Sequence, residues 1–271
     1  MLQIRSGGTI PPVYCVHAQA GHVRLFANLA RHLDPDRPVY GLRAVMRDEA
    51  ALSPYCRLED MAERYASEIR AQRPTGPYYI LAECNGGPLA LELAQQLCAT
   101  GEQVPLLALV DSFGPGEPRL RRFVPRRAYR LVHAARMLAF HLLTVLRLDI
   151  PAKKTYVSER LARILRQYRN RAAARQSAPP PELVNQQGFG EALAAYQPER
   201  YPGRVVLFRG ARLHWGLART RDLGWAAVAA DLEVVELPAY FGTTILEPAV
   251  RLLAERMSDA LDASVPTAGV G

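Results

Sequence analysis

The chain carries the segment PYYILAECNGGPLALELAQQLCA at residues 77–99. Residues 77–82 form a short apolar run that predicts a buried strand, and residues 88–99 predict a helix behind it. Cys84 lies in the tight turn between them and is followed by Gly86 and Gly87. A strand, a sharp turn with small residues and a helix are typical of a nucleophile elbow, in which the nucleophile is exposed above a parallel sheet.

Cys84 fits part of the usual elbow pattern, G-x-S-x-G. Ala82 replaces the first glycine and Cys84 replaces the serine, while Gly86 is retained. The helix that follows directs its N-terminal dipole toward the sulfur, which favours the thiolate. The alternative is a buried structural cysteine in a strand-to-helix loop, but the neighbouring glycines favour a nucleophile.

Strand and helix patterns alternate on both sides of this segment, which predicts an α/β fold with a mostly parallel sheet. Residues 119–175 have helical periodicity and no strand signal, and SAPPP at residues 177–181 interrupts that periodicity. The helical stretch between Asp111 and Gly203 is therefore predicted to be an insertion above the carboxyl ends of the strands, where such sheets bind ligands. The other expected strands are 13–17, 38–42, 104–110, 204–208 and 232–237, and the other expected helices are 23–33, 59–73 and 248–261.

The composition is that of a globular chain, with 271 residues, 49% hydrophobic and 22% charged. It excludes a disordered tail, a collagen-like repeat and a disulfide-stapled miniprotein. The longest apolar stretch, residues 138–146, contains His141 and lies between two arginines, which excludes a membrane span. The N-terminus lacks the order of a signal peptide, so we expect a cytoplasmic protein. The four cysteines form no C-x-x-C pair, so no metal or redox cofactor is expected.

The positive charge is concentrated in one segment. Residues 119–175 hold sixteen Lys or Arg against two acids, although the net charge of the whole chain is only +8. Such a segment binds nucleic acid, a membrane surface or an acidic protein, or else it is simply a solvated helical face. No groove-reading motif accompanies the arginines, so we do not expect nucleic acid as a partner.

The chain resembles the type I thioesterase domains of nonribosomal peptide and polyketide synthetases, which belong to the α/β-hydrolase superfamily. The resemblance extends over about residues 4–261 and implies an α/β-hydrolase fold, as a single domain over 1–271 with a helical lid at about 117–200. The start at Met1 and the tail ASVPTAGVG lead us to expect a free-standing protein. The segments that carry the resemblance are PPVYCVHAQAGH (11–22), RHLDPDRPVYGLRA (31–44), EDMAERYASEIRAQRPTGPYYILA (59–82), GEQVPLLALVDSFGPG (101–116), YPGRVVLFRG (201–210) and DLGWAAVAADLEVVELP (222–238).

The resemblance also implies roles for individual residues. Cys84 matches the family's serine nucleophile, and Asp111, at the end of the strand 104–110, matches the acid of the catalytic triad. The backbone N–H groups of Gln19 and Asn85 match the oxyanion hole, where each donor contributes roughly 3 kcal/mol to the transition state of acyl transfer. The substrate would arrive on the phosphopantetheine of an acyl or peptidyl carrier protein, which is acidic in most families and docks near the lid.

The family's catalytic histidine has no counterpart in this sequence. The family segment resembles V-P-G-D-H-F-T-M-L-x-E-P, whereas residues 237–248 are LPAYFGTTILEP. Phe241 occupies the histidine column, next to Tyr240, or Gly242 does if the gap shifts by one residue. The triad as the family builds it is therefore incomplete.

A replacement base would have to come from another residue. His214, in the loop after the strand 204–208, is the candidate, and the resemblance implies that His17 and His22 lie near the site in the oxyanion turn. For each of them the alternative is a surface or structural histidine, because a general base must reach the nucleophile by a hydrogen bond. Glu83 adjoins the nucleophile, but strand alternation directs its side chain away from the tip of the elbow.

The two departures together predict a particular chemistry. A cysteine is partly ionised without help and is intrinsically nucleophilic, so it can take an acyl group from a pantetheine thioester by nearly isoenergetic thiol exchange. Without histidine the activation of water suffers, and hydrolysis is expected to be slow. The expected function is acyl transfer or chain release in nonribosomal peptide or polyketide biosynthesis. The alternative is a non-catalytic, degenerate thioesterase that binds a carrier or partner protein.

Overall fold

The computed structural model describes residues 1–19, 21–44, 57–115, 124–147, 150, 153–154, 156–158, 161, 165, 181–213, 216 and 220–264. Its contacts divide the chain into two compact units. The larger unit consists of Met1–Pro118, Asn185–Leu213 and Arg219–Gly271, and the smaller one of Arg119–Val184 and His214–Ala218. The larger unit holds the sheet and the elbow.

A seven-stranded sheet with the order β1-β3-β2-β4-β5-β6-β7 forms the larger unit. Only the edge strand β1 runs antiparallel to its neighbour, and the other described pairs are parallel. The predicted α/β fold with a mostly parallel sheet is therefore confirmed. The strands are β1 (Leu2–Arg5), β2 (Val13–Val16), β3 (Val39–Leu42), β4 (Tyr79–Glu83), β5 (Leu106–Val110), β6 (Tyr201–Arg212) and β7 (Ala229–Tyr240).

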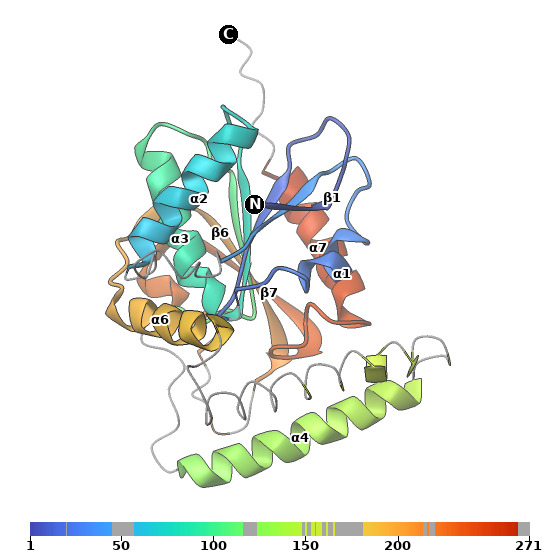
Figure 1. Cartoon of the computed structure of the whole chain (residues 1–271). Helices are drawn as coiled ribbons and strands as arrows, with labels where there is room; N and C mark the ends of the chain where they lie inside the picture. The colour runs from blue at the N-terminus through green and yellow to red at the C-terminus, as the bar shows by residue number, and fades with distance from the viewer. Residues whose placement is uncertain are drawn as a thin grey trace. The chain divides into compact units, whose positions relative to one another are not determined.

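Helices cover both faces of this sheet (Figure 1). In that view α2 (Leu58–Gln72) and α3 (Gly87–Ala99) lie to the left of the sheet, and α1 (Phe26–Ala30) and α7 (Ala249–Asp262) lie to the right. Alternate residues of the strands enter the two cores: Ile80 packs with α2 and α3, and Leu81 packs with α1 and α7. Because central parallel strands are buried on both sides, they are continuous apolar runs, as β4 and β5 are.

One strand was not predicted from the sequence, and one helix, inside the predicted helical stretch between Asp111 and Gly203, was not predicted as a separate element. β1 is short and half-exposed, so it has neither the apolar run nor the alternation by which a strand is predicted. The helix α6 (Pro181–Ala195) begins at a proline that the sequence analysis took as a helix breaker. Proline is tolerated in the first turn of a helix, where its missing N–H would have no intrahelical partner. The prediction of a lid over 117–200 stays a prediction.

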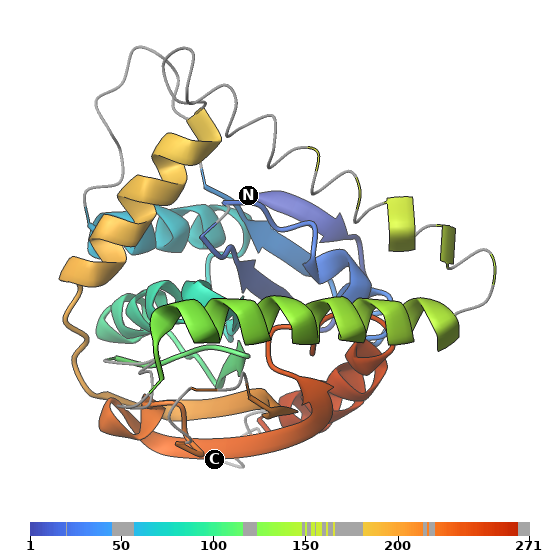
Figure 2. The same cartoon turned by 90° about the horizontal axis from the view of Figure 1, so that it is seen from below.

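The smaller unit contains α4 (Arg126–Arg147), a continuous helix of 22 residues (Figure 2). Its arginines and leucines give it strong amphipathic character, and Leu131, Leu138 and Leu142 are all exposed. Within the described part of the chain, no helix combines the length and the apolar character that crossing a membrane requires.

Candidate functional site

The elbow is built at the end of β4. The strand ends at Glu83, a short 3₁₀ turn covers Cys84–Gly86, and α3 begins at Gly87. Cys84 has a φ of 54°, in the left-handed region that costs a non-glycine residue free energy and is common at functional sites. A Cβ on Gly86 would lie 2.7 Å from the carbonyl oxygen of His17, so the turn can approach β2 only with glycine there.

Contacts from the next strand hold the backbone of the elbow in place. The Ser112 hydroxyl donates a hydrogen bond of 2.7 Å to the carbonyl oxygen of Cys84. The indole N–H of Trp225 in turn donates to the carbonyl oxygen of Ser112 at 3.0 Å. A Cβ on Gly87 would collide with both Ser112 and Trp225. The strained conformation of Cys84 is therefore maintained by packing that leaves no room for larger residues in the turn.

Burial determines the protonation state of the Cys84 thiol. Its pKa is raised to about 12, mainly by desolvation and also by the negative charges of Glu83 and Asp111, while the backbone N–H of Asn85 lowers it. The backbone N–H of Asn85, at the start of the turn that leads into α3, favours the thiolate as expected, but burial and two acids outweigh it. Cys84 is a neutral thiol at physiological pH.

We expect the alkylation of Cys84 by iodoacetamide to accelerate about tenfold per pH unit between pH 7 and pH 10, because the thiolate reacts and its fraction stays far below one. Free cysteine, with a pKa near 8.5, levels off within this range. Peptide mass mapping at each pH measures the rate, and Cys15, which is completely buried, serves as an unreactive internal control. A Cys84 rate that levels off below pH 9 would contradict the raised pKa.

The two residues expected to form the oxyanion hole lie side by side. The side-chain amide of Asn85 donates to the side-chain oxygen of Gln19 at 3.2 Å. Asn85 directly follows Cys84, and Gln19 follows β2, the strand adjacent to β4. The turn after β2 and the elbow therefore meet at the same edge of the sheet. The role of their backbone N–H groups stays a prediction.

Asp111 directly follows β5 and is 1% exposed. Its carboxylate accepts three backbone hydrogen bonds, from Gly210 (2.8 Å) to Oδ1 and from Gly242 (2.7 Å) and Thr244 (3.3 Å) to Oδ2. Burial raises the pKa of Asp111, and Thr244 and the backbone N–H groups of Gly210 and Gly242 oppose that rise. The carboxylate thus binds the backbone of the loop in which the family carries its histidine.

The histidine column of that loop is apolar. The ring of Phe241 is 5% exposed and packs on Phe113, with 4.6 Å between the ring centroids. Gly242 has a φ of 81°, which disfavours a side chain at that position. Tyr240, the other neighbour, lies beneath the guanidinium of Arg212, 5.4 Å from its ring centroid.

His17 is buried and neutral. Desolvation lowers its pKa to about 4, and Nδ1 bonds the carbonyl oxygen of Ala18 at 2.7 Å, which assigns the ring proton to Nδ1. The imidazole packs against the rings of Tyr65 and Phe189. His17 is therefore enclosed between α2 and α6.

The other histidines have different surroundings. His22 is exposed, and His214, the speculative base, lies outside the described residues. His32 bonds Glu247 at 2.7 Å, and His141 bonds Tyr156. The charged groups that act on the Cys84 thiol, among the residues described, are both acids. In the same part of the chain, no three His, Cys, Asp or Glu side chains cluster closely enough to hold a metal ion.

A cavity of about 250 Å³ begins beside the elbow, at Asn85. Three aromatic rings contribute to its wall, from segments far apart in the sequence. Its lining residues are Asn85, Pro88, Leu91, Phe113, Gly114, Pro115, Leu193, Ala194, Tyr196, Pro198 and Trp225.

The family of the chain follows from comparison with known proteins. The model of the thioesterase domain family matches residues 11–214, a range that contains the elbow and Asp111. The chain belongs to the thioesterase domain family. Its mostly parallel sheet and its structural neighbours give this thioesterase domain the α/β-hydrolase fold.

Curated relatives of this thioesterase domain are much longer proteins. It is 39% identical over 112 residues to a probable non-canonical nonribosomal peptide synthetase, CymA, of Salinispora arenicola, matching 41% of this chain and 1% of the relative. It is 34% identical over 115 residues to enterobactin synthase component F of Escherichia coli, matching 42% of this chain and 9% of the relative. The chain thus spans a small fraction of the length of these relatives.

Solved structures share the fold over nearly the whole chain. The thioesterase domain of NocB from the nocardicin cluster superimposes with a TM-score of 0.61 at 23% identity, covering 94% of this chain and 95% of that one. The RedJ thioesterase of the prodiginine pathway in Streptomyces coelicolor gives a TM-score of 0.59 at 18% identity, covering 92% and 85%.

The sequence analysis missed the cavity and the residues that wall it in this thioesterase domain. Leu193 and Tyr196 lie on and after α6, which was not predicted as a separate helix, and Trp225 lies in a short 3₁₀ turn before β7. Tertiary packing brings these segments to the start of α3, and no local pattern in the sequence encodes that meeting. Tyr196 and Trp225 could nevertheless have pointed to this site. Buried tyrosine and tryptophan side chains combine an apolar ring with a polar atom that finds a hydrogen-bond partner.

Proposed function

We propose that this thioesterase domain accepts an acyl or aminoacyl chain from a carrier-protein thioester on Cys84 and passes it on by transfer or chain release, with slow hydrolysis. The setting is nonribosomal peptide or polyketide biosynthesis, as in the synthetases it resembles. One observation supports this most directly: a cysteine occupies the strained elbow beside Gln19 and Asn85, while a buried phenylalanine fills the histidine column.

Acylation in this proposal is a thiol exchange. The Cys84 sulfur attacks the thioester carbonyl carbon. The resulting oxyanion accepts hydrogen bonds from the backbone N–H groups of Gln19 and Asn85. The carbon–sulfur bond to pantetheine then breaks. The proton lost by Cys84 is the proton that the departing pantetheine thiolate gains, so the step needs no oxidant and no net proton. Because one thioester replaces another, its equilibrium constant is close to one.

The possible acceptors of the acyl group differ in whether they need a general base. A neutral amine attacks a thioester without a general base, and a carrier thiol supplies its own thiolate. Water needs a positioned base, which typically contributes 10²–10⁴-fold to the rate. With Phe241 in the histidine column, the acyl-enzyme is expected to await an amine or a thiol.

A carrier protein is the proposed partner, and the basic segment is its proposed contact. Arg127, Arg130 and Arg136 are exposed on α4. An acidic carrier would be attracted to them, and the attraction between exposed charges weakens with salt.

Incubation with an acyl-pantetheine thioester, followed by intact-protein mass spectrometry, tests the acylation. We expect one acyl adduct, located on Cys84, that persists in water and disappears when a thiol or amine acceptor is added. Cys84→Ala, the matched control, acquires no adduct. An adduct that vanishes in water as fast as it forms, or no adduct at all, would remove the transfer proposal.

A non-catalytic carrier-binding module is the second candidate, and the neutral, half-buried Cys84 thiol favours it. This candidate predicts that the protein binds a carrier protein without becoming acylated, and that Cys84→Ala binds it equally well. Binding measured by calorimetry, together with the mass experiment, separates the two functions.

A further inference from the structure

Most of the side chains that line the cavity beside the elbow are apolar. Two of its three aromatic residues have their polar atoms engaged with protein partners: the Trp225 N–H donates to the carbonyl oxygen of Ser112, and the Tyr196 hydroxyl donates to Glu92. Phe113 has no polar atom, and Leu91 adds an aliphatic side chain. The side chains of the wall therefore offer a ligand ring faces and aliphatic carbons, next to the polar side chain of Asn85.

The volume of the cavity limits its occupant to one chemical group. A cavity of about 150 Å³ is enough to bind benzene, and whole small-molecule ligands occupy about 300–1,000 Å³. At about 250 Å³ this cavity accommodates a single aromatic ring or branched aliphatic group. A longer chain has to extend beyond it.

The position of the cavity relative to Cys84 indicates which part of a bound substrate lies in it. It begins at Asn85, the residue after the nucleophile, and continues to Pro88 and Leu91 along the first turns of α3. Cys84 itself is not a lining residue, so a group in the cavity lies next to the elbow, where the unit nearest the Cys84 thioester is the best placed part of a bound chain to reach it. In an aminoacyl or peptidyl chain that group is the side chain of the C-terminal residue.

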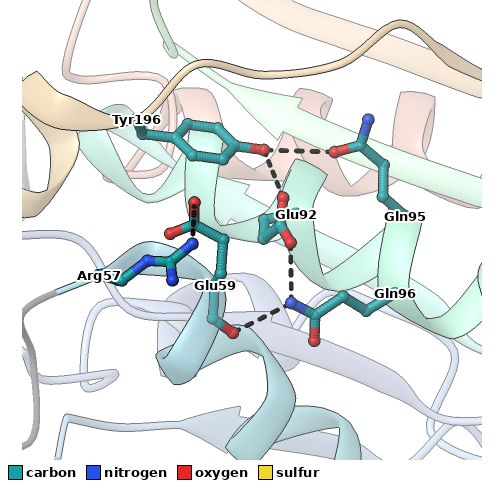
Figure 3. Close-up of polar contacts among 6 residues, drawn as sticks. All are labelled: Arg57, Glu59, Glu92, Gln95, Gln96 and Tyr196. Carbon is teal, nitrogen blue, oxygen red and sulfur yellow. Dashed lines mark hydrogen bonds and ion pairs between the residues drawn. The ribbon is translucent and has the colours of Figure 1, made fainter.

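A hydrogen-bond network fixes Tyr196 in the wall (Figure 3). The Tyr196 hydroxyl donates to Oε2 of Glu92 at 2.7 Å, and the Oε1 of Gln95 lies 3.2 Å away. Gln96 holds Glu92 from the other side, because its amide donates to Oε1 of Glu92 at 2.7 Å and to the carbonyl oxygen of Glu59 at 3.0 Å. The network thus links the end of α6 to α3 and α2.

A further contact restrains the same segment. The Gln95 amide donates to the carbonyl oxygen of Glu199 at 2.9 Å, three residues beyond Tyr196. Burial and the bond to Glu92 both raise the pKa of Tyr196, so its hydroxyl keeps the proton that it donates. The ring is therefore held in one place over the whole working pH range.

We propose that this cavity selects one apolar side chain, aromatic or branched aliphatic, next to the thioester carbonyl, with Tyr196 as the wall that sets its size. Glu92 is the positioning residue that holds Tyr196. This inference rests on the proposed function, because it names the substrate class of the same elbow.

The rates at which Cys84 becomes acylated by the pantetheine thioesters of N-acetylated alanine, leucine, phenylalanine and tryptophan test the selection. We expect the leucyl and phenylalanyl thioesters to react about 10- to 100-fold faster than the alanyl thioester, since added apolar groups in a fitting pocket discriminate by that factor. Tyr196→Ala is expected to raise the tryptophanyl rate relative to the alanyl rate at least tenfold. Leu193→Phe, which fills the cavity, is expected to lower the phenylalanyl rate at least tenfold and leave the alanyl rate unchanged.

The role of the hydrogen bond between Glu92 and Tyr196 is tested by the ratio of the acylation rates with the phenylalanyl and alanyl thioesters. Glu92→Ala and Tyr196→Phe are expected to lower this ratio several-fold, and their double variant no further, because both remove the same bond. Glu92→Gln keeps an acceptor oxygen and is expected to keep the ratio. Glu63→Ala, at an exposed position of α2, is the control that leaves it unchanged.

Different results overturn different statements. If no thioester acylates Cys84, the proposed function fails. If all four thioesters react at equal rates, or if neither Tyr196→Ala nor Leu193→Phe changes the ratios in protein that thermal unfolding shows to be folded, acylation stands and the assignment of the cavity falls.

Discussion

Replacing Phe241 by histidine is expected to accelerate the hydrolysis of the Cys84 acyl-enzyme by about 100- to 10,000-fold, the usual contribution of a positioned general base. The family places its histidine in this column, and the rest of the loop is already arranged around Asp111. The change therefore puts an imidazole into a loop whose backbone already binds Asp111. The rate at which the acyl adduct disappears in water, followed by intact mass, measures the effect.

We expect the carboxylate of Asp111 to accept a hydrogen bond from the new imidazole. A carboxylate offers about four lone-pair sites, and three backbone N–H groups occupy three of them. Position 241 is preferable to position 242, because the φ of 81° at Gly242 strains any side chain there. The substitution removes the tilted ring contact between Phe241 and Phe113, worth about 1 kcal/mol.

The pH dependence identifies the base. Imidazole accepts a proton only when neutral, so the hydrolysis by Phe241→His is expected to rise with pH through about 6.5. Phe241→Gln, which is polar but not basic, is the matched control and should hydrolyse the adduct as slowly as the unchanged protein. Equal rates for the histidine and glutamine variants would show that something other than a missing imidazole preserves the acyl-enzyme.

The sequence was sufficient where local patterns and motifs carry the information. The apolar runs of β4 and β5 and the glycines around Cys84 predict the sheet and the strand-turn-helix, since both depend on residues close together in the chain. The departure at Phe241 was visible in the same way.

Properties that depend on tertiary surroundings could not be predicted. The helix that follows Cys84 favours the thiolate, yet burial and the charges of Glu83 and Asp111 outweigh it and raise the pKa of the thiol. The binding of Asp111 to Gly210, Gly242 and Thr244 joins residues about 100 or more positions apart, and backbone N–H donors leave no trace in residue identity.

Those three bonds change what Asp111 is expected to do. In a complete triad the acid orients a histidine, and its loss lowers the rate while the geometry stays intact. Here the carboxylate holds together the ends of β6 and β7, and its removal leaves backbone N–H groups without an acceptor in or near the core. Each buried donor left unsatisfied costs about 1–3 kcal/mol. Asp111→Ala is therefore expected to lower the free energy of unfolding by on the order of 3 kcal/mol or more.

Thermal and urea unfolding measure this loss, with Asp231→Ala as the control. Asp231 is an exposed acid on β7, and such surface changes usually stay within about 0.5 kcal/mol. Asp111→Asn keeps one acceptor oxygen and should lie between the control and Asp111→Ala. The acylation of Cys84 by folded Asp111→Ala should not slow, because no histidine needs orienting and one of the charges that raise the thiol pKa is gone. Unchanged stability combined with lost acylation would assign Asp111 the ordinary catalytic role instead, and would imply that a base outside the described residues acts with it.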